Sequence, residues 1–481
     1  MHVHFEQNTY TRTDSNFHSL SWMGKVPDSL PDEGGGWKLN RAQYYMEGWL
    51  ASGNGKGVVG ITFTTSHCQK YEAPPRSNFN LRGHRSEVIL VKWNEPYQRL
   101  ATCDSRGVIF VWIKHEGRWS IELINDRNSQ VTDFAWSHDG RMALICYRDG
   151  FVLVGSVAGQ RYWSSMLNLD NTSITCGIWS PDDQEVMFGT TDGQVIVMSS
   201  TGAMIRQFTV SEGNEITCMA WSCEKFNMEE ADGKENDSLH KDEDHSSILA
   251  ICFKFGDINL VHGYDDVCPC VVHTSLQGLK IEWSNCGQYL AVGGFMRLPN
   301  LQCHNELHFY SRGGKRIHHV TVPSQGKPLT ALTWGHNDKR LFLAVGCQLY
   351  VAWVSKQVAP LRFLCNRVVH KCVRHEKNAD QLPLPQRLRQ GVQALFSPTV
   401  KSYIPDPFKL RGFVSTPPPG NERLFCTMIR HGDETSGGHY TLYLEYLGGL
   451  VPLLKGKRAS KLRPDFVIFD PKIRTSGKGE S

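Results

Sequence analysis

The chain has 481 residues, 40% of them hydrophobic, and a formal net charge of +4. So small a charge on so long a chain gives no reason to expect nucleic acid as a partner. The first twenty residues lack the apolar run of a signal peptide, and no stretch approaches the roughly 18 apolar residues of a membrane span. Fifteen scattered cysteines without a C-x-x-C pair favour reduced thiols. We therefore expect a cytoplasmic protein.

An internal repeat runs through the first three quarters of the chain. Trp93, Trp136, Trp179 and Trp221 follow one another at spacings of 43, 43 and 42 residues, which is the period of a four-stranded propeller blade. Each is followed by β runs separated by short turns, as in "LATCDSRGVIFVWI" at 100–113. Residues 1–358 are therefore predicted to form an all-β propeller of seven blades, one for each of Trp22, Trp93, Trp136, Trp179, Trp221, Trp283 and Trp334.

The seventh blade lacks an obvious fourth strand. Its segment at 330–354 shows three β runs before the chain changes character at "PLRFLC". We expect the missing outer strand to come from "HVHF" at 2–5, which would join the first and last blades and remove open sheet edges.

The blades resemble the WD-repeat family. The resemblance rests on a Gly-His pair followed, in the right order within one blade, by a Val-Trp pair. No blade ends in the Trp-Asp dipeptide of the family. Its buried His–Asp–Trp network is therefore expected at most in one place, around His84, Asp104 and Trp112.

Several segments invite a chemical interpretation that their context disfavours. The acidic insert at about 224–246 is predicted to be a disordered loop, either solvated filler or, less favoured, a docking tail for a basic partner. "GKGVVG" at 55–60 fits a phosphate-binding pattern but aligns with the turns of other blades. "CPC" at 268–270 lacks zinc-site spacing, and His318 and His319 have no placed carboxylate. We expect no enzyme activity, no cofactor and no metal.

Two helices are predicted after the propeller. Pro360 suits a helix start, and Leu361, Leu364, Cys365, Val368 and Val369 then fall on one face. "LPLP" at 382–385 interrupts regular helix, and a second amphipathic helix follows. The segment is either a packed extension of the seventh blade or a docking element for another protein.

Residues 359–407 resemble a SOCS box, the adaptor that recruits elongin B, elongin C and a cullin. The resemblance implies a substrate-recognition adaptor of a ubiquitin ligase, with the propeller binding an unknown protein substrate. It assigns elongin binding to Pro360, Leu361, Leu364, Cys365, Val368 and Val369. The cullin-binding run, which points to cullin-5, is Leu382, Pro383, Leu384 and Pro385.

A Pro-rich linker is predicted at 408–420 and a disordered tail at 472–481. Between them, residues 421–471 show three β runs that resemble the first strands of a tubby domain. The combination of a propeller, a SOCS box and the first strands of a tubby domain resembles the tubby-like family. The tubby barrel would be truncated, so this segment is expected to be poorly ordered or to fold back on the propeller.

The family's phosphoinositide site is not carried over to so short a segment. A basic cluster remains as a candidate contact for anionic lipid, although a solvated surface is the favoured interpretation and membrane contact is not expected: Lys455, Lys457, Arg458, Lys461 and Arg463. The propeller alone also resembles the N-terminal domains of intraflagellar-transport scaffold proteins. The alternative function is therefore a WD-repeat scaffold in intraflagellar or membrane trafficking that recruits no ligase.

Overall fold

The computed structural model of the chain describes residues 1–6, 12–25, 38–39, 44–66, 74–169, 171–226, 229–230, 246–263, 266, 268–299, 301–324, 326–373, 376–402, 410–416, 423–431, 439–459, 463 and 465–469. Most of the acidic insert and all of the predicted tail at 472–481 lie outside these residues. Among the helices so described, none has the length and apolar character needed to cross a bilayer.

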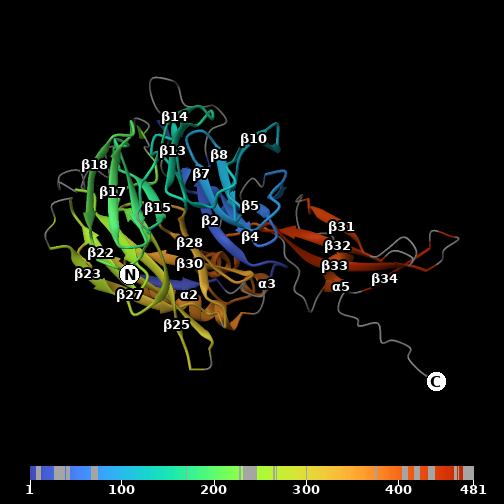
Figure 1. The fold of residues 1–481 in the computed structure, drawn as a ribbon. Coiled ribbons are helices and arrows are strands. Elements are labelled where there is room, and N and C mark those ends of the chain that lie inside the picture. The colour runs from blue at the N-terminus through green and yellow to red at the C-terminus, as the bar shows by residue number, and fades with distance from the viewer. Residues whose placement is uncertain are drawn as a thin grey trace.

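Seven four-stranded sheets make up the larger part of the molecule, and we number them as blades 1 to 7 in chain order (Figure 1). Blade 1 contains β2 (Phe17–Gly24), β4 (Glu47–Asn54), β5 (Val58–Thr65) and β6 (Asn78–Arg82). Blade 2 contains β7 (Val88–Asn94), β8 (Arg99–Asp104), β9 (Val108–His115) and β10 (Arg118–Asp126). Blade 3 contains β11 (Val131–Trp136), β12 (Met142–Tyr147), β13 (Phe151–Ser156) and β14 (Arg161–Met166).

The remaining blades repeat this order. Blade 4 contains β15 (Ile174–Trp179), β16 (Glu185–Thr190), β17 (Gln194–Ser199) and β18 (Met204–Thr209). Blade 5 contains β19 (Ile216–Trp221), β21 (Leu249–Phe253), β22 (Asp257–Val261) and β23 (Cys270–His273). Blade 6 contains β24 (Gln277–Trp283), β25 (Tyr289–Arg297), β26 (Cys303–Ser311) and β27 (Arg316–Thr321). Blade 7 contains β28 (Leu329–Gly335), β29 (Arg340–Val345), β30 (Gln348–Ser355) and β1 (His2–Phe5).

The blades close into a ring. The first strand of each blade contacts the first strand of the next, and β28 of blade 7 contacts β2 of blade 1. The predicted strand exchange is confirmed, because β1 pairs antiparallel with β30 and sets Val3 opposite Val354. Two further short strands from long loops of blades 1 and 5, β3 (Lys38–Leu39) and β20 (Glu229–Glu230), pair in parallel.

Four of the seven repeated tryptophans join neighbouring blades through hydrogen bonds. Each stands near the end of the first strand of its blade, as the sequence repeat predicts. The indole Nε1 of Trp179 donates a hydrogen bond to the carbonyl oxygen of Ala135 in the first strand of the preceding blade, at 3.3 Å. Trp136, Trp283 and Trp334 make the same kind of contact, at 3.0 to 3.1 Å. At these four positions a large ring near the boundary between blades also satisfies a backbone acceptor, which suits tryptophan.

The remainder of the chain forms two small units. The helical segment contains α2 (Leu361–Cys372), α3 (Glu376–Ala379), α4 (Gln386–Gln393) and η2 (Ala394–Phe396). The tail sheet contains β31 (Cys426–His431), β32 (His439–Tyr446), β33 (Gly449–Arg458) and β34 (Phe466–Phe469), one strand more than the three predicted β runs. A short helix, α5 (Leu410–Ser415), lies within the predicted linker. In Figure 1 the tail sheet lies to one side of the propeller, next to β4 and β5.

Candidate functional site

Helix α2 contacts blade 7 through the face that carries aromatic and charged side chains. The Phe363 ring lies 5.9 Å from the ring of His2 and 5.4 Å from that of His4, both on β1. Arg367 Nη1 lies 3.0 Å from His2 Nε2. Burial, followed by the nearby Arg367 charge, lowers the pKa of His4 to about 3, so this imidazole is neutral beside the guanidinium. The β1 strand that closes the ring therefore also supports α2.

The apolar face of α2 points away from the propeller. Leu361 is 77% exposed, Val368 is 64% exposed and Cys365 is also exposed. Leu364 is 37% exposed, Val369 is half-buried, and Pro360 caps the helix start from an exposed position. The residues predicted to bind elongin thus share one helix face that the described part of the chain leaves largely uncovered. Such a patch on a structured helix is typical of a protein-interaction site.

The "LPLP" run leads into α4 and lies in the same unit as α2. Pro383 and Pro385 are exposed, while Leu382 and Leu384 are half-buried. Pro385 is the residue that precedes α4, where its missing N–H costs no helical hydrogen bond. Helix α4 packs closely on α2, since a Cβ at Gly391 would lie 2.5 Å from Asn366 Nδ2. The predicted elongin-binding and cullin-binding residues are therefore held in one small helical unit.

The helical unit is anchored to the propeller at its far end as well. Thr65 of β5 donates its N–H to the carbonyl oxygen of Thr399, and Lys401 donates its N–H to Phe63, both at 2.9 Å. The Glu6 carboxylate accepts hydrogen bonds from Trp353 Nε1 at 2.6 Å and from the Thr399 N–H at 3.1 Å. The segment therefore spans from blade 7 to blade 1, which agrees with the interpretation of a packed extension while still leaving the apolar face of α2 outward.

The tail sheet docks onto blade 1 through the turn between β32 and β33. Leu447 in this turn is fully buried, and its N–H donates to Asn78 Oδ1 at 3.1 Å. The Gly448 N–H donates to Asn80 Oδ1 at 3.1 Å, and Asn54 Nδ2 donates to the Gly448 carbonyl oxygen at 3.0 Å. Of the two alternatives for the tail, the structure shows that it folds back on the propeller. Asparagine suits this role because its side chain donates and accepts at once.

The predicted lipid-contact residues that the structure describes do not all share one face of the tail sheet. Lys455 and Lys457 are exposed and alternate along β33, so they share a face of the tail sheet. Arg458 follows Lys457 directly and therefore lies on the opposite face. Arg463 is exposed outside the strands, and Lys461 lies outside the described residues.

The expected His–Asp–Trp network of the WD-repeat family is confirmed in blade 2. His84 Nδ1 lies 3.2 Å from Asp104 Oδ2, and Trp112 Nε1 donates to Thr102 Oγ1 at 2.9 Å. Thr102 Oγ1 also lies 2.7 Å from His84 Nε2 and so connects the two halves, a role that the sequence analysis missed. Burial lowers the pKa of His84, although Asp104 opposes that shift, so the network holds a neutral imidazole. This network is a stabilising element of the blade.

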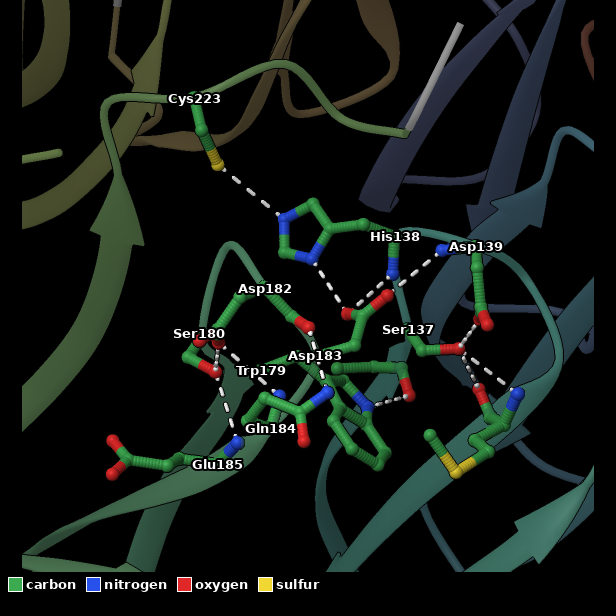
Figure 2. A network of polar contacts seen from close by, with 12 residues as sticks. Ser137, His138, Asp139, Trp179, Ser180, Asp182, Asp183, Gln184, Glu185 and Cys223 are labelled. Carbon is green, nitrogen blue, oxygen red and sulfur yellow. Dashed lines mark hydrogen bonds and ion pairs between the residues drawn. The ribbon is translucent and has the colours of Figure 1, made fainter. Parts of the chain in front are cut away.

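A second network joins blades 3, 4 and 5. Figure 2 shows His138 between the carboxylate of Asp183 and the thiol of Cys223. His138 Nδ1 lies 2.9 Å from Asp183 Oδ1, and Cys223 Sγ lies 3.3 Å from His138 Nε2. Burial alone would lower the pKa of His138, but its hydrogen bonds to Asp183 and Cys223 outweigh burial and raise this pKa to about 10.

The order thiol, imidazole, carboxylate is also found in cysteine nucleophiles, but a structural role explains this network better. Asp183 accepts the backbone N–H groups of His138 and Asp139, at 2.8 and 2.9 Å. Asp338 of blade 7 makes the same pair of contacts with the backbone of Asn285 and Cys286 in blade 6, where no histidine takes part. The carboxylate therefore joins neighbouring blades whether or not a thiol and an imidazole are present.

A cavity of about 330 Å³ lies at the centre of the ring, and the first strand of every blade contributes to its lining. Glu95 accepts a hydrogen bond from Tyr44 Oη at 2.9 Å, and Lys225 Nζ forms an ion pair with Glu282 at 2.6 Å. The charged groups named here are thus already satisfied within the protein. Among the described residues, no group of three or more His, Cys, Asp or Glu side chains is placed to hold a metal ion.

Comparison with known proteins assigns the propeller to a family. The family model described as WDR35/TULP4 N-terminal matches residues 39–355. Tubby-related protein 4 of Mus musculus and that of Homo sapiens are each 48% identical to the chain, covering 100% and 99% of it but 32% of their own length. WD repeat-containing protein 35 of Homo sapiens is 29% identical over 70% of the chain and 28% of its own length. The chain thus spans about a third of the length of these relatives. Because the family model covers well over half of the chain, the protein belongs to the family with the WDR35/TULP4 N-terminal propeller.

Proposed function

We propose that the protein is a substrate-recognition adaptor of an elongin B/C–cullin-5 type ubiquitin ligase. The observation that carries the proposal is the orientation of α2, which turns Leu361, Cys365 and Val368 away from the propeller while its other face is held by β1. A helix that served only to brace blade 7 would direct its apolar face toward the blade. The adaptor would form no covalent intermediate with ubiquitin, and the transfer chemistry would belong to its partners.

The geometry suits a helix that inserts into a groove of a partner. Leu361 and Cys365 are one turn apart, so both fit neighbouring positions along a single groove. A cysteine thiol in such a position packs as a small hydrophobic side chain. Burying an exposed leucine side chain contributes roughly 1.5–3 kcal/mol, so two or three such side chains supply a substantial part of a binding energy.

The test is capture of purified elongin B/C by the full chain, with cullin-5 as a second readout. We expect the double variant Leu361→Pro with Cys365→Phe to lose elongin capture. Proline is tolerated at the first helical position, and Cys365 is exposed, so the propeller should stay folded. Arg362→Ala, on the same helix but outside the apolar face, is the matched control and should bind normally. Undiminished capture by the double variant would show that the SOCS-box interpretation is wrong.

A WD-repeat scaffold without ligase recruitment is the second candidate. The observation in its favour is the pair of anchors that tie the helical segment to blades 7 and 1, because an extension of the propeller needs no further partner. This alternative predicts that a chain lacking residues 360–406 captures the same proteins as the full chain. The adaptor proposal predicts that elongins and cullin-5 disappear from the captured set while propeller-bound proteins remain.

A further inference from the structure

A cleft of about 900 Å³ lies between the propeller and the tail sheet. Its propeller side is built from turns of blades 1 and 2, which bring together Lys56, Arg82, Arg85 and Arg106. Its other side is the tail sheet, with Ile429, His431 and Tyr443. The two sides come from residues more than three hundred positions apart in the chain.

The cleft carries uncompensated positive charge. Four cationic side chains and two carboxylates, Asp14 and Glu87, line the cleft, and Lys56 is paired with Asp14 at 2.5 Å. The guanidinium groups of Arg82, Arg85 and Arg106 are exposed and make no hydrogen bond or ion pair with any other residue that the structure describes. Three arginines therefore face one recess, and within the described part of the chain none of their guanidinium groups is paired.

The positive surface continues across the tail sheet. Ile429 pairs with Thr441, which in turn pairs with Lys455. Directly paired residues of adjacent antiparallel strands lie on the same face of a sheet, so Lys455 shares the face of Ile429. His431 pairs with His439, which in turn pairs with Lys457, so Lys457 lies on the same face as the cleft-lining His431.

Both walls of the cleft are fixed in place. The turn at Leu447 and Gly448 is bound by three asparagines of blade 1, and Leu450 donates its N–H to Asp14 Oδ1 at 2.9 Å. Arg76 adds an ion pair with Glu445 at 3.3 Å. A recess between docked walls presents its arginines in a stable arrangement, which lowers the entropic cost of binding a ligand.

We propose that this cleft binds a phosphorylated segment of a protein substrate, with the phosphate held by Arg82, Arg85 and Arg106. Guanidinium groups match phosphate oxygens in bidentate geometry, and a phosphoserine carries about −1.5 to −2 charges at neutral pH. Ile429 and Tyr443 supply an apolar wall for the side chains beside the phosphate. The inference deepens the adaptor proposal by naming its substrate class, although peptide binding itself does not require ligase recruitment.

The arrangement of the tail sheet favours a peptide over a membrane surface. The exposed apolar side chains Met428 and Ile468 are 64% and 67% exposed. Met428 adjoins the cleft-lining Ile429, and Ile468 pairs with Gly456, which lies between Lys455 and Lys457, so Met428 and Ile468 lie on the face opposite to the cleft. Val467, which pairs with Lys457, is the exposed apolar residue of β34 on the cleft face. A tail sheet seated on a bilayer through Met428 and Ile468 would direct the basic cleft away from the lipid headgroups.

The test uses the full chain and a degenerate peptide library with a fixed central phosphoserine, beside the same library without phosphate. We expect selective retention of the phosphorylated library, and about a tenfold or greater loss of affinity in the variant Arg85→Glu with Arg106→Glu. Arg118→Glu is the matched control, because Arg118 is exposed at the far end of an outer strand of the same blade and does not line the cleft. Thermal unfolding of each variant confirms that the fold is retained.

Equal binding of both libraries, or unchanged binding by the double variant, would overturn the proposal. Vesicles that contain phosphatidylinositol bisphosphate form a separate arm, and arginine-dependent binding to vesicles without peptide binding would assign the cleft to lipid instead. Elongin capture is measured on the same preparations. If the adaptor proposal is wrong, elongin capture is absent while binding of the phosphorylated peptide library is unaffected.

Discussion

Glu95 is a carboxyl group enclosed by the centre of the propeller. It is 6% exposed, and Tyr44 donates a hydrogen bond to it at 2.9 Å. Burial raises the pKa of Glu95 to about 7, against the opposing attraction of Lys225 and the hydrogen bond from Tyr44. Because the unfolded carboxyl releases its proton near pH 4.5 and the folded one near 7, the folded state binds more protons between these values. The free energy of unfolding therefore falls as pH rises through this window.

The variant Glu95→Gln should remove this dependence on pH. A glutamine can still accept the hydrogen bond from Tyr44 but has no charge to desolvate. We expect the variant to match the wild type near pH 4.5 and to exceed its stability by up to about 3 kcal/mol at pH 8. Urea unfolding midpoints across this range provide the measurement. A wild-type midpoint that stays flat between pH 5 and 8 would show that Glu95 ionises normally.

At the scale of elements, the turn between β32 and β33 connects two parts of the chain that share no local sequence pattern. Gly60 on β5 makes this contact possible, because a Cβ there would lie 2.2 Å from the backbone nitrogen of Gly448 and 2.3 Å from the carbonyl carbon of Leu447. Backbone atoms on both sides leave no flexible side chain that could move aside. The docking of the tail sheet therefore depends on a glycine at this position.

We expect Gly60→Val to release the tail sheet from blade 1 while the propeller remains folded, since valine is well suited to a strand. Hydrogen exchange of residues 439–459 should rise, and the exchange of β7 to β30 should stay the same. Gly313→Val is the matched control, because a Cβ at that exposed turn meets no atom within 4 Å. If exchange of the tail sheet is unchanged, the docked arrangement of the turn is wrong.

At the scale of the whole molecule, the sequence predicted what repeats. Tryptophans 42 or 43 residues apart predicted the blades because each stands near the end of the first strand of its blade, and four of the seven repeated tryptophans donate a hydrogen bond to the preceding blade. The three-strand seventh blade predicted the exchange with β1, because a ring cannot leave one blade short without an open edge. The helical spacing of the apolar residues on α2 predicted an apolar face, but its outward direction follows only from the contacts of Phe363 with β1.

What the sequence could not predict depends on contacts between distant residues. Asn54, Asn78 and Asn80 look like ordinary turn and strand residues until the Leu447 turn is placed against them. Arg85 lies in the connection between β6 and β7, and Arg106 in the turn between β8 and β9, and only the fold brings both to one cleft, opposite Ile429. Non-local contacts of this kind leave no periodic signal in a single sequence, so periodicity finds the blades and misses the cleft.

Strand β1 closes the ring and supports α2, so one short segment should affect both stability and the helical unit. Deleting residues 1–6 removes buried Val3, exposes the edge of β30 and takes away the Glu6 contacts with Trp353 and Thr399. We expect a loss of at least about 3 kcal/mol in stability and a tendency to associate through the open edge. Thermal unfolding and size-exclusion chromatography provide the two measurements.

The variant Glu6→Gln separates the two roles of this segment. It keeps the strand pairing of β1 but removes the charge that strengthens the hydrogen bonds from the Thr399 N–H and from Trp353 Nε1, so the anchor of the helical unit should weaken while the ring stays closed. We expect near-normal thermal unfolding together with faster hydrogen exchange in α2 and α4. Because the apolar face of α2 already points outward, elongin capture should survive in this variant. A ring that unfolds as readily with Glu6→Gln as with the deletion would mean that closure depends on the Glu6 anchor more than on strand pairing.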